Sequence, residues 1–324
     1  MTARVRVPAS SSNLGAGFDC IGIAVDRWLV ASVTLGGSGI SIRRRGTLST
    51  VRVRADQDLI TRGFRAACAA GGASPTGTGG GGGGGGGVTI DAASDIPVGC
   101  GLGSSAAAIV AGAMLADAAL ELGLSRAKIL EIATTIEGHP DNVAAAIYGG
   151  AVLSVHTQAG FVSSSLRVSP AIELLIAVPP FPNDTKAARA ALPHTLPHSD
   201  AVVAASRAAA LVQGLATGDG ALLGAALDDL LHVPFRRARI PGYDAVVAAG
   251  QRAGAFGATL SGAGSAIVAI APRERSAAVG TAMLAAWRDV GIAAELITCS
   301  SAVPGASVSA VTTHHVPVTS QEIS

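Results

Sequence analysis

The sequence predicts an α+β chain built as two lobes, and three observations support this fold class. First, the 324 residues are 49% hydrophobic, enough to bury one large core or two modest ones. Second, strand patterns dominate the first half of the chain, whereas helical patterns are interspersed after Pro182. Third, the change of pattern lies near residues 155–170. We therefore expect one domain over 1–160, a second over 161–302 and a disordered polar tail over 303–324.

Alternating polar and apolar residues predict the strands, apolar residues at helical spacing predict the helices, and repeated glycine predicts a loop. In the first half we expect strands at 4–9, 28–35, 40–55 and 88–97, and helices at 57–71, 104–122 and 126–136. The glycine tract at 79–87 is expected to be a flexible surface loop, because repeated glycine gives the chain no preferred conformation. In the second half we expect strands at 149–156, 161–168, 172–180 and 292–298, a strand-loop-strand unit at 254–272, and helices at 184–191, 199–214, 219–231, 243–253 and 273–289.

Composition excludes several classes of function. A net charge of +1 with only 14% charged residues leaves no electrostatic footprint for nucleic acid or an anionic membrane. The start of the chain lacks the apolar core of a signal peptide, and the longest apolar run meets Asp117 and Glu121 before it could span a bilayer. The cysteines are far apart, which fits a reducing cytoplasm and argues against disulfides or a zinc site. We expect a cytoplasmic protein.

The stretch PVGCGLGSSAAA has features of a phosphate-binding turn. Gly99, Gly101 and Gly103 can adopt positive φ and let an anion approach the backbone, while the following helix supplies free N–H groups. Ser104 and Ser105 stand where hydroxyls could cap the helix or touch phosphate and metal. A tight turn with a serine N-cap is the alternative. The P-loop pattern is excluded because no lysine is present, and the dinucleotide-binding pattern because two helices follow the turn.

From Pro97 to Ala107 the chain reads P-x-x-x-G-L-G-S-S-A-A, which resembles the ATP-binding motif of the GHMP kinase superfamily. Four further stretches, in collinear order, are similar to motifs of that superfamily and of its homoserine kinase branch: 8–22, 137–150, 183–193 and 260–269. The resemblance runs from about residue 4 to 298. It implies the two-lobed GHMP kinase fold, with an N-terminal α/β lobe like ribosomal protein S5 that contains a left-handed βαβ unit, and a ferredoxin-like α+β C-terminal lobe.

The activity that the resemblance implies is transfer of a phosphoryl group from ATP to the hydroxyl of L-homoserine, giving O-phospho-L-homoserine in threonine biosynthesis. Another GHMP kinase acting on a different alcohol and a catalytically inactive, ligand-binding relative stay open as alternatives. The expected partner is the small-molecule substrate L-homoserine, with no nucleic acid and no membrane. A homodimer also stays open.

The resemblance further implies which residues bind the nucleotide and its metal. The turn is expected to bind ATP through Pro97, Val98, Gly99, Cys100, Gly101, Leu102, Gly103, Ser104, Ser105, Ala106 and Ala107. Phosphoryl transfer needs Mg²⁺, held by an oxygen from the helix start and a carboxylate, for which Ser105 and Glu137 are the candidates. The alternative for Glu137 is a solvated carboxylate at a helix end.

The stretch GHPDN is expected to lie at the acceptor site. It holds His139, Asp141 and Asn142 on a short loop that Pro140 makes rigid. The structural alternative is an Asx-type turn that caps the next helix. The resemblance places Asn142 beside the hydroxyl that is phosphorylated.

The remaining site residues are expected to bind the amino and carboxylate groups of an amino-acid substrate. Similar proteins hold the amino group and backbone of the substrate with residues that match Asn13 and Asp19. Arg189 and Arg236 are candidates for bidentate binding of its α-carboxylate, and Thr185 lies one helical turn before Arg189. Gly262 belongs to a second glycine turn, 261–265, which would brace the first.

The chain departs from the family pattern in ways that bear on mechanism. Proline, arginine, glutamate and proline are common in the family where this chain has Ala16, Cys100, Val233 and Ser265. Many GHMP kinases use an aspartate base helped by a lysine, but the matching motifs here offer no lysine, and Asn142 stands where a base is expected. A neutral amide cannot accept a proton. We therefore expect Asn142, Glu137 and Ser105 to act by positioning and charge stabilisation, with the hydroxyl proton passing to the phosphate.

Overall fold

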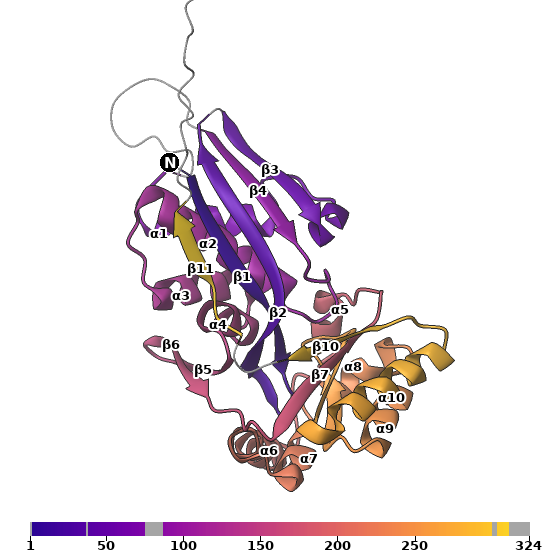
Figure 1. Cartoon of the computed structure of the whole chain (residues 1–324). Helices are drawn as coiled ribbons and strands as arrows, with labels where there is room; N and C mark the ends of the chain where they lie inside the picture. Colours follow the sequence, from indigo (N-terminus) through magenta and orange to yellow (C-terminus); the bar gives the residue numbers. More distant parts are fainter. Residues whose placement is uncertain (1, 37, 75–86, 300–302, 311–324) are drawn as a thin grey trace, which may run out of the picture.

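Two β-sheets organise the molecule, one in each lobe (Figure 1). The computed structural model describes residues 2–36, 38–74, 87–299 and 303–310. The first sheet has the order β11-β1-β2-β4-β3, and β5 extends it from β2 with β6 beyond. Its strands are β1 (Thr2–Asn13), β2 (Gly17–Leu35), β3 (Gly39–Gly46), β4 (Gly87–Ser94), β5 (Ala151–Thr157), β6 (Gly160–Leu166) and β11 (Ser307–Ala310).

Strand β2 links the first sheet to the second lobe because it is 19 residues long. It pairs with β1 on one side, and on the other with β4 near its end and with β5 near its start. The turn from β1 to β2 reaches the second lobe, where the N–H of Ala16 donates to the carbonyl of Ala226 at 3.0 Å. The end of β1 and the start of β2 therefore lie where the lobes meet.

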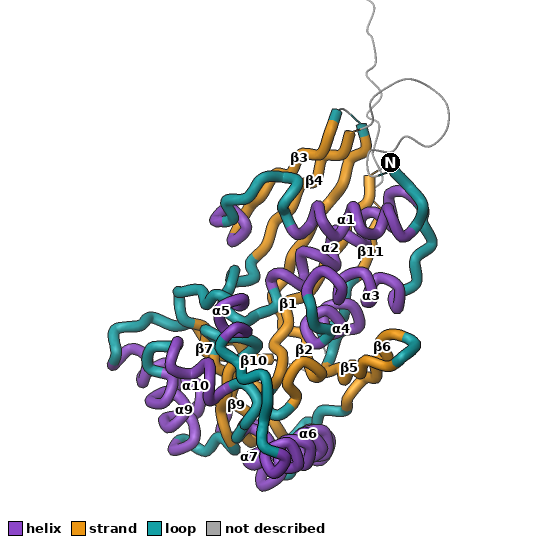
Figure 2. The backbone as a smooth tube through the Cα atoms, turned by 180° about the vertical axis from the view of Figure 1, so that it is seen from behind, coloured by secondary structure: helices purple, strands orange, loops and turns teal. Residues whose placement is uncertain are grey.

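Helices cover one face of the first sheet (Figure 2). They are α1 (Leu59–Ala70), which connects the parallel pair β3 and β4, α2 (Ser104–Leu120), α3 (Arg126–Glu137) and α4 (Asp141–Tyr148). Helices α1 and α2 cross at glycines: a Cβ on Gly63 would lie 2.1 Å from the carbonyl oxygen of Ile109, and one on Gly112 would lie 1.9 Å from that of Ile60. Since α2 is also rich in alanine, it packs close behind the turn that precedes it.

The second sheet is antiparallel, with the order β10-β7-β9-β8. Its strands are β7 (Ile172–Val178), β8 (Gly257–Leu260), β9 (Ile267–Pro272) and β10 (Glu295–Cys299). The helices of this half are α5 (Thr185–Ala190), α6 (His198–Thr217), α7 (Gly220–Leu227), α8 (Val233–Arg236), α9 (Tyr243–Arg252) and α10 (Ser276–Asp289). Val246 of α9 and Met283 and Trp287 of α10 are fully buried in a core of their own against this sheet.

The division of the chain differs from the expected one at both ends of the second lobe. Residue 160 begins β6, which pairs with β5, so the first sheet continues past the predicted boundary to Leu166. The expected disorder of the tail does not hold for residues 303–310, because β11 pairs antiparallel with β1 and Ala306 is buried. Backbone hydrogen bonds to an existing strand order this short segment. The rest of that tail, and the glycine tract up to residue 86, lie outside the described residues.

Two local predictions are correct only in part. The helix expected over 219–231 ends at Leu227, since the Asp229 carboxylate accepts the N–H groups of Leu231, His232 and Val233 and so turns the chain into α8. The run expected to give edge strands over 40–55 forms β3 and then the 3-10 helix η1 (Thr47–Thr50). None of the helices among the described residues has the length and apolar character to cross a membrane. All four cysteines are unpaired, as expected.

Candidate active site

The turn between β4 and α2, residues 97–103, has the backbone of an anion-binding loop; we call it the glycine loop. Gly101 and Gly103 have φ of +81° and +62°, a region that glycine enters without strain. A Cβ on Gly101 would lie 2.2 Å from the carbonyl oxygen of Ser261, and one on Gly103 would lie 2.2 Å from Oγ of Ser10. These two glycines are therefore required for both conformation and close packing.

Carbonyl groups of the glycine loop are bonded to the second lobe. The carbonyl of Gly99 accepts from the N–H of Asn183 at 2.8 Å, and that of Cys100 from the N–H of Ala266 at 3.0 Å. The carbonyl of Gly101 accepts from Oγ of Ser261 at 2.6 Å. Holding these carbonyls toward the second lobe keeps them from competing for an anion that the loop's N–H groups could bind.

No side chain caps the N-terminus of α2. Its N-cap is Gly103 in the left-handed conformation, and Ser104 and Ser105 are its first helical residues. The alternative of a turn closed by a serine N-cap is therefore wrong. The N–H groups of the first turn, together with the positive end of the helix dipole, are available to a bound anion.

Ser105 and Glu137 meet at the ends of α2 and α3. The Ser105 hydroxyl donates to Oε1 of Glu137 at 2.5 Å. Burial raises the pKa of Glu137 above its usual value, although the bond from Ser105 opposes that shift. A buried carboxylate with a neutral partner is short of positive charge, and a carboxylate and a hydroxyl are oxygen ligands that Mg²⁺ accepts.

The GHPDN loop carries an ion pair at the start of α4. Nδ1 of His139 lies 2.6 Å from Oδ1 of Asp141, and the same oxygen accepts the N–H of Asn142 at 2.6 Å. Burial opposes both charges, yet hydrogen bonding to His139 and its charge lower the pKa of Asp141, while the bond and charge of Asp141 raise the pKa of His139. The Asx-type contact at the start of α4 is thus present, and His139, Asp141 and Asn142 also line the pocket described below.

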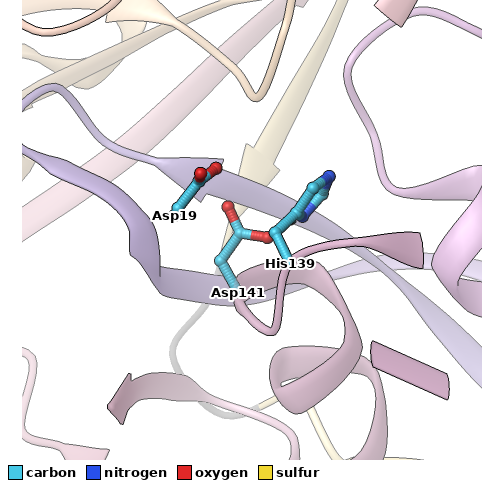
Figure 3. A group of neighbouring side chains, drawn as sticks. All are labelled: Asp19, His139 and Asp141. Carbon is cyan, nitrogen blue, oxygen red and sulfur yellow. The ribbon is translucent and has the colours of Figure 1, made fainter. Parts of the chain in front are cut away.

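The carboxylate of Asp19, at the start of β2, faces this loop (Figure 3). Candidate ligand atoms of Asp19, His139 and Asp141 all lie within 4.8 Å of one another. Their charges are already engaged, Asp141 by His139 and Asp19 by Arg189. Among the described residues, no cationic side chain lies within ion-pair distance of the partly buried Glu137 carboxylate, so Ser105 and Glu137 remain our candidate metal ligands.

The Asn142 amide is held by two serines of β1. Oγ of Ser10 donates to Oδ1 of Asn142 at 2.9 Å, and Nδ2 of Asn142 donates to Oγ of Ser12 at 2.9 Å. Ser10 and Ser12 point to the same side of the strand because side chains alternate, whereas Ser11 points to the other side and bonds Oγ of Ser261 at 2.8 Å. One Nδ2 hydrogen of Asn142 is left to the pocket.

Asn13 and Asp19 flank the turn from β1 to β2. Oδ1 of Asn13 accepts the N–H of Asp19 at 2.9 Å, and its Nδ2 donates to the carbonyl of Gly262 at 2.9 Å. Arg189 of α5 reaches across the lobes and donates to both carboxylate oxygens of Asp19. Asn13 therefore joins the first lobe to the second glycine turn as well as lining the site.

Arg236 is the second predicted arginine and is almost fully enclosed, at 2% exposure. Its Nε donates to the carbonyl of Ala188 at 3.2 Å, and its Nη1 lies 3.3 Å from Nδ1 of His232. No carboxylate among the described residues lies within ion-pair distance of it. Burial, and then the charge of Arg189, lower its pKa to about 10, so the group is a cation that gains from an anionic partner.

One pocket between the lobes gathers most of the predicted residues. It is lined by Asn13, Asp19, Gly99, Gly101, Gly103, Ser104, Ser105, Glu137, His139, Asp141, Asn142, Thr185, Arg189, Arg236 and Gly262. Ser12 and Ala263 line it too and were missed by the sequence analysis. Pro97, Val98 and Cys100 line a neighbouring cavity behind the loop, whereas Leu102, Ala106 and Ala107 are buried in the first core.

Comparison with known proteins decides the family. Residues 62–150 match the model of the GHMP kinase N-terminal domain, and residues 211–289 match that of the C-terminal domain. The chain is 38% identical over 298 residues to a homoserine kinase of Synechococcus, covering 90% of this chain and 93% of that one. It is 40% identical over 289 residues to the homoserine kinase of Gloeobacter violaceus, covering 87% and 92%. The chain belongs to the homoserine kinase family.

The structure of the homoserine kinase from Cytophaga hutchinsonii superposes on this one with a TM-score of 0.82 at 29% identity, covering 95% of this chain and 97% of the other. This confirms the expected GHMP kinase fold. As a member of the homoserine kinase family, the chain is a kinase. Cys100 is one of the departures of this chain from the family pattern. Its Sγ lies 3.5 Å from the carbonyl oxygen of Val98 and 3.6 Å from that of Phe181. Val233 is buried in the second core.

Proposed function

We propose that this kinase transfers the γ-phosphoryl group of ATP to the side-chain hydroxyl of L-homoserine, giving O-phospho-L-homoserine. The observation that carries the substrate assignment is Arg236, a buried guanidinium in the pocket without a carboxylate partner among the described residues. An α-carboxylate would supply that charge in bidentate geometry. Asp19, which also lines the pocket, would receive the α-ammonium group, and a plain alcohol or sugar would satisfy neither group.

The nucleotide phosphates would lie at the glycine loop and the N-terminus of α2, where backbone N–H groups and Ser104 line the pocket. An adjoining apolar cavity is lined by Val98 and Gly99 of this loop and by Ser104 and Ser105 of α2. Its other walls include Leu48, Val51, Val53, Leu59 and Ala108. We assign the purine base to this cavity, because a planar apolar ring suits these walls and the shared residues would carry the phosphates into the site.

The proposal includes Mg²⁺ bound by Ser105 and Glu137. The donor set fits this ion, since it offers one hydroxyl and one carboxylate oxygen at the wall of the pocket. When bound, Mg²⁺ would neutralise charge on the β- and γ-phosphates. Glu137 would be kept ionised by the cation, against the burial that raises its pKa.

The acceptor hydroxyl would lie against Asn142, whose free amide hydrogen can donate to the hydroxyl oxygen. Gly103 packs on Oδ1 of Asn142, so this amide stands beside the start of α2 and hence beside the phosphates. Asp141 is a weak base, because His139, the N–H of Asn142 and Ser12 all stabilise its charged form. We therefore propose that Asn142 aligns the hydroxyl and that its proton passes to the transferred phosphate.

A coupled assay of ADP release tests this function across a set of amino-acid alcohols, mevalonate and galactose. We expect L-homoserine to give the highest kcat/KM and mass spectrometry to identify O-phospho-L-homoserine. A higher kcat/KM for an alcohol without the α-amino acid group would show a different GHMP kinase. Binding of ATP and L-homoserine by calorimetry with no ADP release would show an inactive relative.

A further inference from the structure

His232 lies between Arg236 and the turn from β1 to β2, and its side chain is fully buried. Its ring stacks on that of Phe18, with centroids 4.9 Å apart and planes 18° apart. The guanidinium of Arg236 lies 5.2 Å from the centroid of the same Phe18 ring. Phe18 therefore contacts both groups, and the three side chains form one packed unit at the wall of the pocket.

The neighbours of His232 determine its tautomer. Nε2 lies 3.3 Å from the carbonyl oxygen of Gly15, which can only accept, so Nε2 carries the proton. Nδ1 lies 3.3 Å from Nη1 of Arg236, which can only donate, so Nδ1 must present its lone pair. Both ring nitrogens are thus used by a neutral imidazole, whereas an imidazolium would set an N–H against an N–H of Arg236.

The backbone under His232 is fixed as well. Oδ2 of Asp229 accepts the N–H groups of His232 and Val233, each at 2.7 Å, and lies 3.7 Å from Nε2 of His232. Asp229 therefore fixes the backbone from which the imidazole projects, while Phe18, Gly15 and Arg236 hold the ring itself. The chain of contacts runs from Asp229 through the imidazole to the guanidinium.

These contacts use only part of Arg236. Nε is taken by the carbonyl of Ala188 and one hydrogen of Nη1 by His232. The other Nη1 hydrogen and both on Nη2 have no protein acceptor among the described residues, and Arg236 lines the pocket. A guanidinium held on two sides in this way presents a fixed edge to a carboxylate.

We propose that His232 is a positioning residue for substrate recognition, which as the neutral Nε2–H imidazole holds Arg236 in the orientation that binds the substrate carboxylate. The inference rests on the proposed function, because it assigns that carboxylate to Arg236. It also gives this buried histidine a role beyond the packing of the core.

Two isosteric variants separate the two nitrogens. In His232→Asn the amide oxygen can take the place of Nδ1 and still accept from Arg236. In His232→Gln the amide nitrogen can take the place of Nε2 and still donate to Gly15, but nothing accepts from Arg236. Each variant keeps one hydrogen bond of the two, so their thermal unfolding midpoints should agree. We expect KM for L-homoserine to rise about tenfold or more in His232→Gln and at most about threefold in His232→Asn, with KM for ATP unchanged in both.

A double-mutant cycle completes the kinetic test. If His232 acts through Arg236, His232→Gln should have little effect on kcat/KM for L-homoserine when Arg236→Leu is already present. Equal KM values for L-homoserine in the two isosteric variants, parallel changes in KM for ATP, or additive effects with Arg236→Leu would each overturn the proposal.

A spectroscopic readout does not depend on the substrate. Nitrogen-15 NMR of the histidine rings at pH 7 should show His232 as the neutral Nε2–H tautomer, with the Nδ1 resonance altered in Arg236→Leu. A doubly protonated ring, or a proton on Nδ1, would overturn the inference even if the wild-type kinase phosphorylates homoserine. Absence of homoserine phosphorylation with this tautomer observed would instead contradict the proposed function and its carboxylate assignment.

Discussion

Arg189 donates to both carboxylate oxygens of Asp19, with Nη1–Oδ2 at 2.9 Å and Nη2–Oδ1 at 2.8 Å. The two side chains are 43% and 32% exposed, so water screens the pair and its net stabilisation is small. Under the function proposed above, an arriving amino acid would exchange into this pair, with its ammonium group toward Asp19 and its carboxylate toward Arg189 as well as Arg236. Arg236 needs no such exchange, because no carboxylate of the described chain occupies it.

We expect Arg236→Leu to lower kcat/KM for L-homoserine by about 10- to 150-fold, the equivalent of losing a hydrogen bond to a charged group worth about 1.5–3 kcal/mol. KM for ATP should change little, since the glycine loop is a separate element. The matched control is Arg237→Leu, because Arg237 is 55% exposed and pairs with Asp244. Equal losses for homoserine and for its carboxylate-free analogue would show that Arg236 supports the fold or the nucleotide instead.

Glu137→Gln should lower kcat by about 100-fold or more and weaken the dependence on Mg²⁺, because the variant lacks an anionic ligand near the phosphates. Its control is Glu131→Gln on the same helix, where the carboxylate pairs with Lys128 at the surface. Circular dichroism and titration of Mg²⁺ against ADP release measure fold and metal dependence separately. Unchanged Mg²⁺ dependence in Glu137→Gln would reject the metal assignment.

The outline of the fold could be predicted because it rests on local patterns. Alternation predicted the middle of β1 and the last eight residues of β2, and helical spacing predicted α1 and α10. The first part of β2, residues 17–27, was not predicted. β11 could not be predicted this way, since its order comes from pairing with β1, some 300 residues earlier in the chain. The early end of α7 depends on the side chain of Asp229, which a helical pattern does not reveal.

The sequence motifs predicted most of the residues that line the pocket, but they predicted none of the contacts that orient these side chains. Ser12 follows Ser10 at strand spacing, a weak sign that the two share a partner, yet that partner, Asn142, is remote in sequence. His232 precedes Arg236 by four residues, a spacing that brings two side chains together on a helix. Their contact was still not predictable, because burial of both depends on Phe18 from the other lobe.

Gly103→Ala should lower kcat by about 100-fold, because the added Cβ would meet Oγ of Ser10 at 2.2 Å and Oδ1 of Asn142 at 2.9 Å and so displace the amide that aligns the acceptor. Gly123→Ala is the control: its φ is also positive, at +70°, but nothing lies within 4 Å of the new Cβ. Gly123→Ala should lose about 1–2 kcal/mol of stability from backbone strain alone. Gly103→Ala should lose more, because its Cβ also clashes with Ser10 and Asn142. Similar kcat values for the two would show that space beside Asn142 is not critical.

The stability of the folded chain should fall on the acid side partly through His232. Burial first, and then the charge of Arg236, lower the pKa of this imidazole from 6.5 to about 4 in the folded state. Protonation below pH 6.5 therefore favours the unfolded chain, and the stability that His232 contributes at pH 7 is lost as pH falls from 6.5 to 4. The full effect is on the order of 3 kcal/mol.

Urea unfolding at pH 7 and pH 4.5 measures this loss, and His232→Gln should reduce the difference between the two pH values. His194→Gln is the control, since His194 is an exposed residue. Protonation of His139 stabilises the folded chain as pH falls, because its pKa is raised in the folded state. The comparison between variants, and not the wild-type curve alone, therefore identifies the group that titrates. An unchanged difference in His232→Gln would mean that another group titrates.

The last prediction concerns the acceptor proton. Because the folded structure lowers the pKa of Asp141 below 3.8, this carboxylate is ionised throughout the range in which kcat can be measured. If the proton passes to the phosphate, kcat should show no acid limb that belongs to Asp141, and Asp141→Asn should lower kcat through misplaced His139 and Asn142 without removing a limb. A limb from His139 is expected instead to move to lower pH in Asp141→Asn, because the charge of Asp141, which raises the pKa of His139 against burial, is gone. His139→Asn identifies such a limb by abolishing it. An acid limb present in the wild-type kinase and in His139→Asn but absent from Asp141→Asn would make Asp141 the general base and reject direct transfer to the phosphate.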